Sequence, residues 1–268
     1  MSSKIAWFNQ RSIRELFTPG KILPTSEPHP GQWKILEILE DEDHQMEQAD
    51  VRGGAKSYAT LKLVCAKAAD PSIQARMRVY LQVPAAGTET EQSSIRARQA
   101  TTFEPEELRA YRIISMEESV SKFTPKLLGF HKARQNDSEL VPGGFIIFIV
   151  WEFVPGQPLD DGSGEASAFW DLDRPTRDKV RKLFKESFLS TTRKLGKLRV
   201  WPGSHGPHNL VWNGKTQTLY WVRFRELEEN DPPSWSDIWF PCYGLVKAPL
   251  DDEWDDPNWN GDTSRWEY

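Results

Sequence analysis

Several shortages in this sequence of 268 residues each exclude a class of protein. It has two cysteines, Cys65 and Cys242, too few for a disulfide framework, so we expect a reducing compartment. The longest apolar run, FIIFIVW at 145–151, falls far short of the ~20 residues that span a membrane. The opening MSSKIAWFNQRSIRELF carries no apolar stretch of the kind that a secretory signal has. These shortages predict a cytoplasmic protein that does not enter a membrane.

Basic residues are nowhere dense enough to form a nucleic-acid-binding stripe interleaved with aromatic side chains. The net charge of −5 is uneven, because the residues from Glu226 onward hold twelve Asp or Glu and two Lys or Arg, a balance of −10. Residues 1–225 carry the difference, +5. Two interpretations stay open: the acidic end folds over a more basic body, or it is simply solvated.

Tryptophan, in contrast, is abundant. The chain has twelve, and five of them lie in the acidic segment 227–268. Large amphipathic rings on a polar segment are typical of aromatic anchors that dock onto the body of the protein or onto a partner. The simpler alternative is that these rings cap the hydrophobic core of the domain before them.

The pattern of apolar residues predicts an α+β fold with an antiparallel sheet. The turn signal ADPSI separates two strand-like segments and predicts a hairpin, while QWKILEILE reads as strand or helix and the polar residues 41–57 as a loop. The predicted strands are 58–68, 74–83, 126–133 and 143–153, followed by NLVW and TLYWVRF around the turn NGKTQ. The predicted helices are 103–119 and 175–196, the second with Val180, Leu183, Phe184, Phe188 and Leu195 on one face.

One stretch, GSHGPHNLVWN at 203–213, has the outline of a loop that transfers phosphate. An asparagine, Asn209, is followed directly by a strand. Five residues before it, where such a loop needs an aspartate, stands Ser204. A neutral hydroxyl cannot accept and hold a proton as a carboxylate does, and general-base assistance is typically worth about 10²–10⁴ in rate.

In their order and spacing, these segments resemble the aminoglycoside phosphotransferase-like branch of the protein-kinase-like family, particularly its members in filamentous fungi. The resemblance runs from Lys62 to Glu226 and implies a two-lobe fold with an antiparallel-sheet N-lobe and a reduced helical C-lobe. The implied divisions are an extension at 1–30, an N-lobe with one main helix at 31–155, a C-lobe with a degenerate catalytic loop at 156–226, and the Trp-rich segment 227–268.

The resemblance also implies a nucleotide site that has decayed. Arg78 stands at the position of the phosphate-binding lysine, Glu107 at that of its partner, and Asn209 at that of a metal-binding asparagine. Arg223 replaces the metal-binding acid, and a cation there repels Mg²⁺. The expected phosphate flap, 41–57, is rich in acids and has only Gly53 and Gly54. We therefore expect no metal and no cofactor.

The loop also contains His205 and His208. Histidine is the side chain whose ordinary pKa lies near neutrality, so either residue is a candidate acid or base. Structural, hydrogen-bonded histidines are the alternative for both. The candidate catalytic residues are thus Ser204, His205, His208 and Arg223.

Two main functions follow as expectations, and a third, a regulator that binds nucleotide but is inactive, rests on Arg78, Glu107 and Asn209. The first is a pseudokinase that binds a partner protein or a ligand in the cleft between its lobes without transferring phosphate. The second is an enzyme of secondary metabolism that reuses the cleft without metal or nucleotide, for example to cyclise or isomerise a small hydrophobic metabolite.

Overall fold

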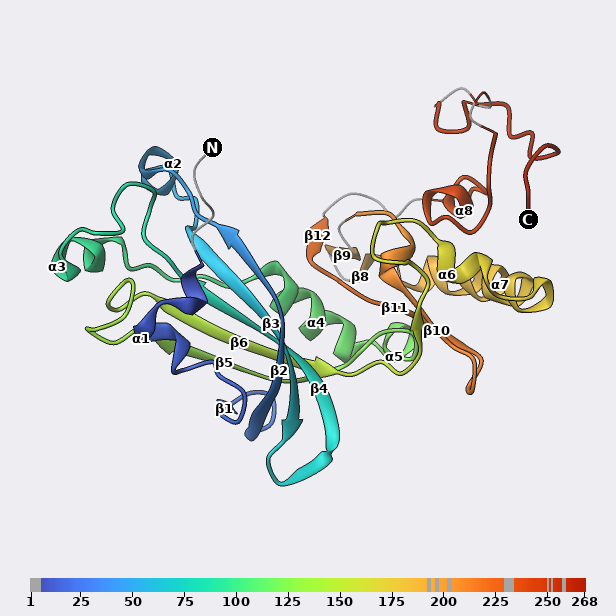
Figure 1. Ribbon diagram of the computed structural model, residues 1–268. Helices are drawn as coiled ribbons and strands as arrows, with labels where there is room; N and C mark the ends of the chain where they lie inside the picture. Colours follow the sequence, from blue (N-terminus) through green and yellow to red (C-terminus); the bar gives the residue numbers. More distant parts are fainter. Residues whose placement is uncertain are drawn as a thin grey trace. The chain divides into compact units, whose positions relative to one another are not determined.

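The computed structural model describes residues 6–191, 194–195, 198–201, 204–228, 234–249, 251, 253–256 and 259–268 (Figure 1). The chain divides into two compact units. The first comprises Met1–Pro105 and Leu127–Phe153, and the second comprises Glu106–Lys126 and Val154–Tyr268. The helix predicted at 103–119 was assigned to an N-lobe at 31–155, but from Glu106 onward it belongs to the second unit.

The first unit is built on a six-stranded, wholly antiparallel sheet in the order β1-β2-β3-β4-β6-β5 (Figure 1). Its strands are β1 Ile22–Thr25, β2 Gly31–His44, β3 Tyr58–Lys67, β4 Asp70–Gln82, β5 Leu127–Arg134 and β6 Phe145–Glu152. Its short helices are η1 Trp7–Asn9, α1 Arg11–Arg14, α2 Gln48–Arg52, α3 Ser93–Arg96 and η2 Ala97–Gln99. The β3–β4 hairpin confirms the expectation drawn from ADPSI.

The prediction of a loop at 41–57 is wrong for its first four residues. Asp41 to His44 belong to β2, where they pair in register with Leu61 to Tyr58 of β3. Acidic residues have low strand propensity, but pairing along a long neighbouring strand overrides it. The side chains also find partners, because Thr60 donates a hydrogen bond to Glu42 over 3.4 Å and Trp7 donates one to Asp43 over 3.0 Å.

The N-terminal residues complete the core of the first unit. Trp7, Phe8, Ile13 and Phe17 are buried in one cluster with the sheet residues Met77, Val79, Leu81 and Phe148. The Phe17 ring lies edge-on to Phe8 at 5.7 Å and to Phe148 at 6.2 Å. Residues 7–17 thus form the layer that covers this face of the sheet.

The second unit combines helices with two small antiparallel sheets, in the orders β11-β10-β7 and β12-β9-β8. Its helices are α4 Glu106–Met116, α5 Glu118–Ser121, α6 Ser167–Trp170, α7 Arg174–Thr191, η3 Pro207–Asn209 and α8 Trp239–Cys242. Its strands are β7 Gln157–Pro158, β8 Lys194–Leu195, β9 Leu198–Trp201, β10 Leu210–Asn213, β11 Thr218–Trp221 and β12 Glu226–Glu228. With the six-stranded sheet of the first unit, this confirms the α+β class.

Helix α7 is shorter than the sequence predicts. It ends at Thr191, whose hydroxyl donates a hydrogen bond to the carbonyl of Ser187 over 3.0 Å, and Leu195 lies in β8. Such back-bonding by threonine weakens a helix near its end. The backbone of Leu195 then pairs with Leu198 in a hairpin, which takes Leu195 away from the apolar face of α7.

The Trp-rich segment packs onto the core of the second unit. Trp235 lies edge-on to Phe188 of α7 at 5.4 Å, and Trp239 contacts the same ring at 4.8 Å. Trp266 is buried and stacks on Trp259, with the two rings only 5° from parallel. These described tryptophans therefore cap the hydrophobic core, as the simpler of the two alternatives expected.

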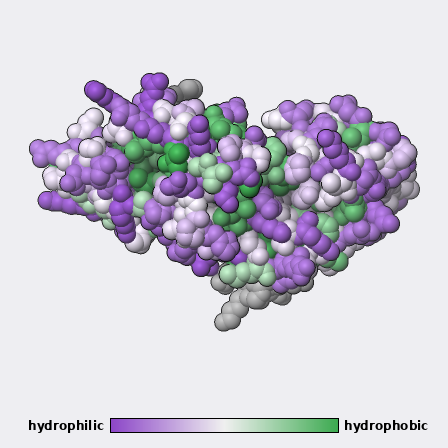
Figure 2. All heavy atoms as spheres, turned by 90° about the horizontal axis from the view of Figure 1, so that it is seen from below, coloured by the Kyte–Doolittle hydropathy of each residue, from purple (hydrophilic) through white to green (hydrophobic). Residues whose placement is uncertain are grey.

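Outside these cores, the face of the molecule in Figure 2 is mostly hydrophilic, and hydrophobic residues reach it in several separate places. That mixture is ordinary for a folded protein. Among the described residues, none of the helices combines the length and apolar character that a membrane crossing requires.

Candidate functional site

The predicted phosphate-transfer loop lies between two strands of the second unit, β9 and β10, and two backbone hydrogen bonds hold it at Asn209. Its short helix η3 leads directly into β10, and the Asn209 amide donates a hydrogen bond to the carbonyl of Gly206 over 3.2 Å. The amide of Val222, just after β11, donates to the carbonyl of Asn209 over 2.9 Å. Because β10 and β11 pair in register, the loop and the end of β11 are neighbours.

Gly206 shapes this loop. Its φ of +153° lies in a region that residues with a side chain rarely adopt. A Cβ at this position would lie 2.5 Å from Cε1 of the His208 ring. The imidazole therefore packs directly against the glycine backbone, and the glycine is needed for that approach.

Ser204 and His208 are brought together by the turn at Gly206. The Ser204 hydroxyl and Nε2 of His208 lie 3.0 Å apart, at hydrogen-bond distance. When the proton of neutral imidazole is on Nδ1, Nε2 accepts the bond from the hydroxyl. The structure thus pairs two of the candidate residues that the sequence named separately.

Asn209 anchors the loop from inside the core. Its side chain is 0% exposed, and Nδ2 donates to the carbonyl of Ser204. Its Oδ1 is buried and accepts no hydrogen bond from the part of the chain that the structure describes. A buried acceptor left unpaired costs about 1–3 kcal/mol, so this oxygen favours a donor from a ligand or water.

Arg223 follows β11 with an unusual backbone. Its φ is +66°, a left-handed conformation that costs a non-glycine residue roughly 1–2 kcal/mol. Its side chain is exposed, whereas the next residue, Phe224, is fully buried. The buried phenylalanine and the hydrogen bond at Val222 hold the strained position, and such strain is concentrated at functional sites.

The charges near His208 act on its titration. Burial lowers the pKa of the His208 imidazole from its ordinary value of 6.5, and the positive charges of Arg223 and Arg225 lower it further. The carboxylate of Asp160 partly opposes them. His208 is therefore neutral at pH 7 and available as a hydrogen-bond acceptor.

A titration of the histidine ring signals by NMR should show these fields. We expect Arg223→Gln to raise the pKa of His208 and Asp160→Asn to lower it, since each removes one of two opposing charges. Because protonation of His208 favours the unfolded state, its contribution to stability should be lost as the pH falls below 6.5. Shifts in the same direction in both variants would contradict this assignment of charges.

A cavity of about 700 Å³ opens beside the loop, within the second unit. One wall is the stretch from His205 to His208, and the others come from residues 164–171 and 241–247. The apolar lining includes Trp170, Pro207, Pro241 and Val246, and the polar lining includes Glu165, Asp171 and Lys247. A volume of this size suits a small organic molecule.

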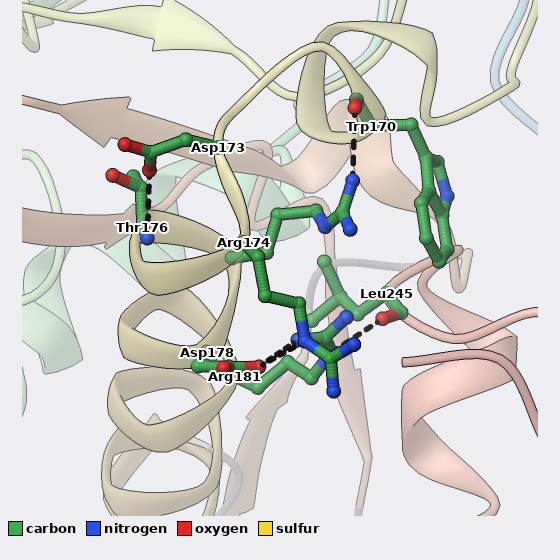
Figure 3. A network of polar contacts seen from close by, with 8 residues as sticks. Trp170, Asp173, Arg174, Thr176, Asp178, Arg181 and Leu245 are labelled. Atoms are coloured by element: carbon green, nitrogen blue, oxygen red, sulfur yellow. Dashed lines mark hydrogen bonds and ion pairs between the residues drawn. The ribbon is translucent and has the colours of Figure 1, made fainter.

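The walls of this cavity are tied to α7 by the network in Figure 3. Arg181 of α7 donates to the carbonyl of Leu245 over 2.8 Å. Arg177 of the same helix donates to the carbonyl of Trp170 over 3.1 Å. The indole of Trp170 in turn donates to the carbonyl of Gly244 over 3.0 Å. Helix α7 thus holds both the Trp170 wall and the 241–247 wall.

The other predicted site residues lie elsewhere or have structural contacts. His205 packs edge-on against Trp239, with ring centroids 5.2 Å apart, which favours a structural role. Arg78 is buried on β4 in the first unit, 5.9 Å above the Trp151 ring, and Glu107 is buried on α4 in the second. The predicted pairing of Arg78 with Glu107 stays a prediction.

Asp160 and Arg225 were not among the site residues predicted from the sequence. Asp160 is placed by the pairing of β7 with β10, a contact between segments more than 50 residues apart that no local pattern announces. Arg225 had a weak signal, because it repeats Arg223 two positions later. Among the described residues, no group of three or more His, Cys, Asp or Glu could hold a metal ion.

Comparisons with known proteins leave the family open. No family model and no curated protein matches this sequence. Two similar solved structures are protein kinases: the kinase PK-1 of Cydia pomonella granulovirus, with 12% identity and a TM-score of 0.38, and the kinase domain of BubR1, with 9% and 0.40. The matches cover 76% and 80% of this chain but only 55% and 51% of those chains. The chain thus spans about half their length, and both scores are too low to establish a common fold.

Proposed function

We propose that this chain is a kinase-like protein, of fungal type, that no longer transfers phosphate and works in the cytoplasm by binding a ligand or a partner protein. Two observations support the proposal: the resemblance in the sequence, and the residues of the loop that contains Ser204 and Asn209. Phosphoryl transfer needs an acid aimed at the nucleophile and acids that hold Mg²⁺. In this loop the acid that would face the nucleophile is replaced by the Ser204 hydroxyl, which lies at hydrogen-bond distance from the His208 imidazole.

The observation that carries the proposal is the position of Arg223, whose positive charge acts on His208. Arg223 follows β11, where the resemblance requires the metal-binding acid, and its positive charge acts on His208 in the loop 203–213. A positive charge close to a Mg²⁺ position opposes the metal and instead favours an anionic group of a ligand. The loop is therefore better suited to binding than to metal-dependent transfer.

The cavity beside the loop supports a small molecule as the ligand. Its volume of about 700 Å³ lies within the range of roughly 300–1,000 Å³ that holds drug-sized molecules. Its lining combines apolar side chains with a few polar ones, the combination that binds and orients an organic ligand.

A second function, an enzyme that needs neither metal nor nucleotide, is favoured by one contact. The 3.0 Å distance between Ser204 and His208 is the distance between a nucleophile and its base. In this second proposal the chain is an enzyme of secondary metabolism.

Thermal unfolding with ATP, GTP and ADP, each with and without Mg²⁺, tests the first function. We expect no stabilisation that requires Mg²⁺. A ligand at ~100 times its Kd adds about 2.7 kcal/mol, which moves the midpoint of a domain of this size by roughly 5–10 °C. A shift of that size seen only with Mg²⁺ would contradict the proposal.

Arg223→Gln is the matched variant for this measurement, because Arg223 is exposed and its replacement leaves the core unchanged. If nucleotide phosphate binds through the charge of Arg223, any Mg²⁺-independent shift should shrink in Arg223→Gln. A panel of small apolar molecules, measured in the same way, tests the cavity as the ligand site.

A further inference from the structure

We propose that Ser204 and His208 form a nucleophile–base pair that transfers an acyl group from an ester whose acyl part is apolar. The inference deepens the proposed function, since it rests on the cavity beside the loop being a ligand site. The pair comes from one loop, four residues apart, with Ser204 Oγ and His208 Nε2 at 3.0 Å. This is the spacing in which an imidazole takes a proton from an attacking hydroxyl.

The loop holds both groups in place before any ligand binds. The His208 ring rests on the backbone of Gly206, where there is no room for a Cβ. Ser204 is held through its carbonyl by the amide of Asn209, which is fully buried. The backbone that carries the nucleophile is therefore supported from the core side, and the base packs on Gly206, so the loop favours the approach that catalysis by a hydroxyl requires.

The charges around the pair act on both of the charges that acyl transfer develops. Attack on a carbonyl makes an oxyanion, which the positive fields of Arg223 and Arg225 favour. Proton uptake makes an imidazolium at His208, which Asp160 favours, although burial and Arg223 outweigh it and lower the pKa of this base. Both signs of charge therefore act on the pair, from segments that follow β11 and β7 respectively.

The cavity indicates the kind of acyl group. His205 to His208 form one of its walls, so a carbonyl at Ser204 would have the cavity beside it. The rings and methyl groups of Trp170, Pro207, Pro241 and Val246 line it, and Trp170 is fixed by its bond to Gly244. An apolar chain or ring fits against these four side chains, while Glu165, Asp171 and Lys247 line another part of the cavity.

The reaction balances with water as the second reactant. The Ser204 oxygen bonds to the acyl carbon while its proton passes to Nε2 of His208. The bond from the acyl carbon to the ester oxygen then breaks, and the leaving alcohol takes the proton from His208. Water attacks the acyl-serine, gives one proton to His208, and releases the carboxylic acid as that proton returns to the Ser204 oxygen.

Labelling with an alkyl fluorophosphonate, followed by mass spectrometry, tests the pair without knowledge of the natural ester. The serine oxygen bonds to phosphorus and fluoride leaves. We expect one adduct per chain, on Ser204, none on Ser204→Ala, and labelling of His208→Gln slowed at least about 100-fold. Asp160→Asn, which leaves both members of the pair in place, should slow labelling by a smaller factor.

Ser72→Ala is the matched control, since Ser72 is also exposed but bonds to a carboxylate, Asp70, over 2.6 Å. It should label at the wild-type rate. Far-UV circular dichroism checks that His208→Gln is folded, and Asp160→Asn keeps the test valid if it is not. No adduct on the wild-type chain, an adduct on another serine, or equal rates in wild type, His208→Gln and Asp160→Asn would overturn the pair.

The outcome also separates this inference from the function on which it rests. If no adduct forms and no nucleotide shift requires Mg²⁺, the binding function stands and the pair is wrong. If a nucleotide shift requires Mg²⁺, the binding function fails whatever the labelling shows.

Discussion

Trp221→Ala should lower the free energy of unfolding of the second unit by about 3–5 kcal/mol. The indole is 0% exposed and stacks on Phe184 at 5.0 Å, with the Tyr243 ring edge-on at 5.2 Å. Its Nε1 donates to the hydroxyl of Ser187 over 2.9 Å. Truncation removes a buried indole that packs against α7 and leaves a cavity that the surrounding rings cannot fill.

Urea unfolding followed by far-UV circular dichroism measures this loss, because α7 is the longest helix among the described residues. Trp221→Phe should lose less, about 1–2 kcal/mol, since a ring remains but the hydrogen bond to Ser187 does not. The control is Leu189→Ala on α7. The Leu189 side chain is 51% exposed, so a change below about 0.5 kcal/mol is expected. Equal losses at Trp221 and Leu189 would show that the packing around Trp221 is wrong.

The double variant Trp7→Ala and Phe17→Ala should leave little folded first unit. Each ring is buried against the sheet, and each truncation should cost about 3–5 kcal/mol. A typical domain has only about 5–15 kcal/mol of stability in total. Because this core lies within the first unit, the loss should appear there and not in the α7 signal of the second unit.

Limited proteolysis and urea unfolding of the full chain measure the effect, and cleavage should become rapid within residues 22–105. Ile22→Ala is the control, since its side chain is 51% exposed on the edge strand β1. A double variant that resists protease as well as Ile22→Ala does would mean that residues 7–17 are a dispensable extension. The structure indicates instead that they are one layer of the fold.

The sequence predicted the long, periodic elements well. Val180, Phe184 and Phe188 were placed on one face of a helix, and all three are buried in the second core. Periodicity over several turns is a strong local signal, because each turn repeats the same burial. The end of α7 was wrong by several residues, since a hairpin formed with later residues competes for Leu195, and no pattern within the helix reports it.

The role of residues 7–17 was not predictable from pattern. The burial of these residues against β4 and β6 brings together side chains about 60 or more positions apart in the sequence. Such long-range contacts depend on where the sheet places its apolar face. Only the folded chain decides that.

For the candidate site, the sequence by itself determined the composition of the loop: residues 204–209 are a serine, two histidines, a glycine, a proline and an asparagine, followed by two predicted strands, the second of which contains Arg223. These follow from residue identity and spacing, which the chain carries along its length. The tertiary structure alone decided that Ser204 meets His208 while His205 packs on Trp239, and that Asp160 and Arg225 act on the same imidazole. The physical reason is that a hydrogen bond or an electric field depends on distance in space, and the β7–β10–β11 pairing sets those distances.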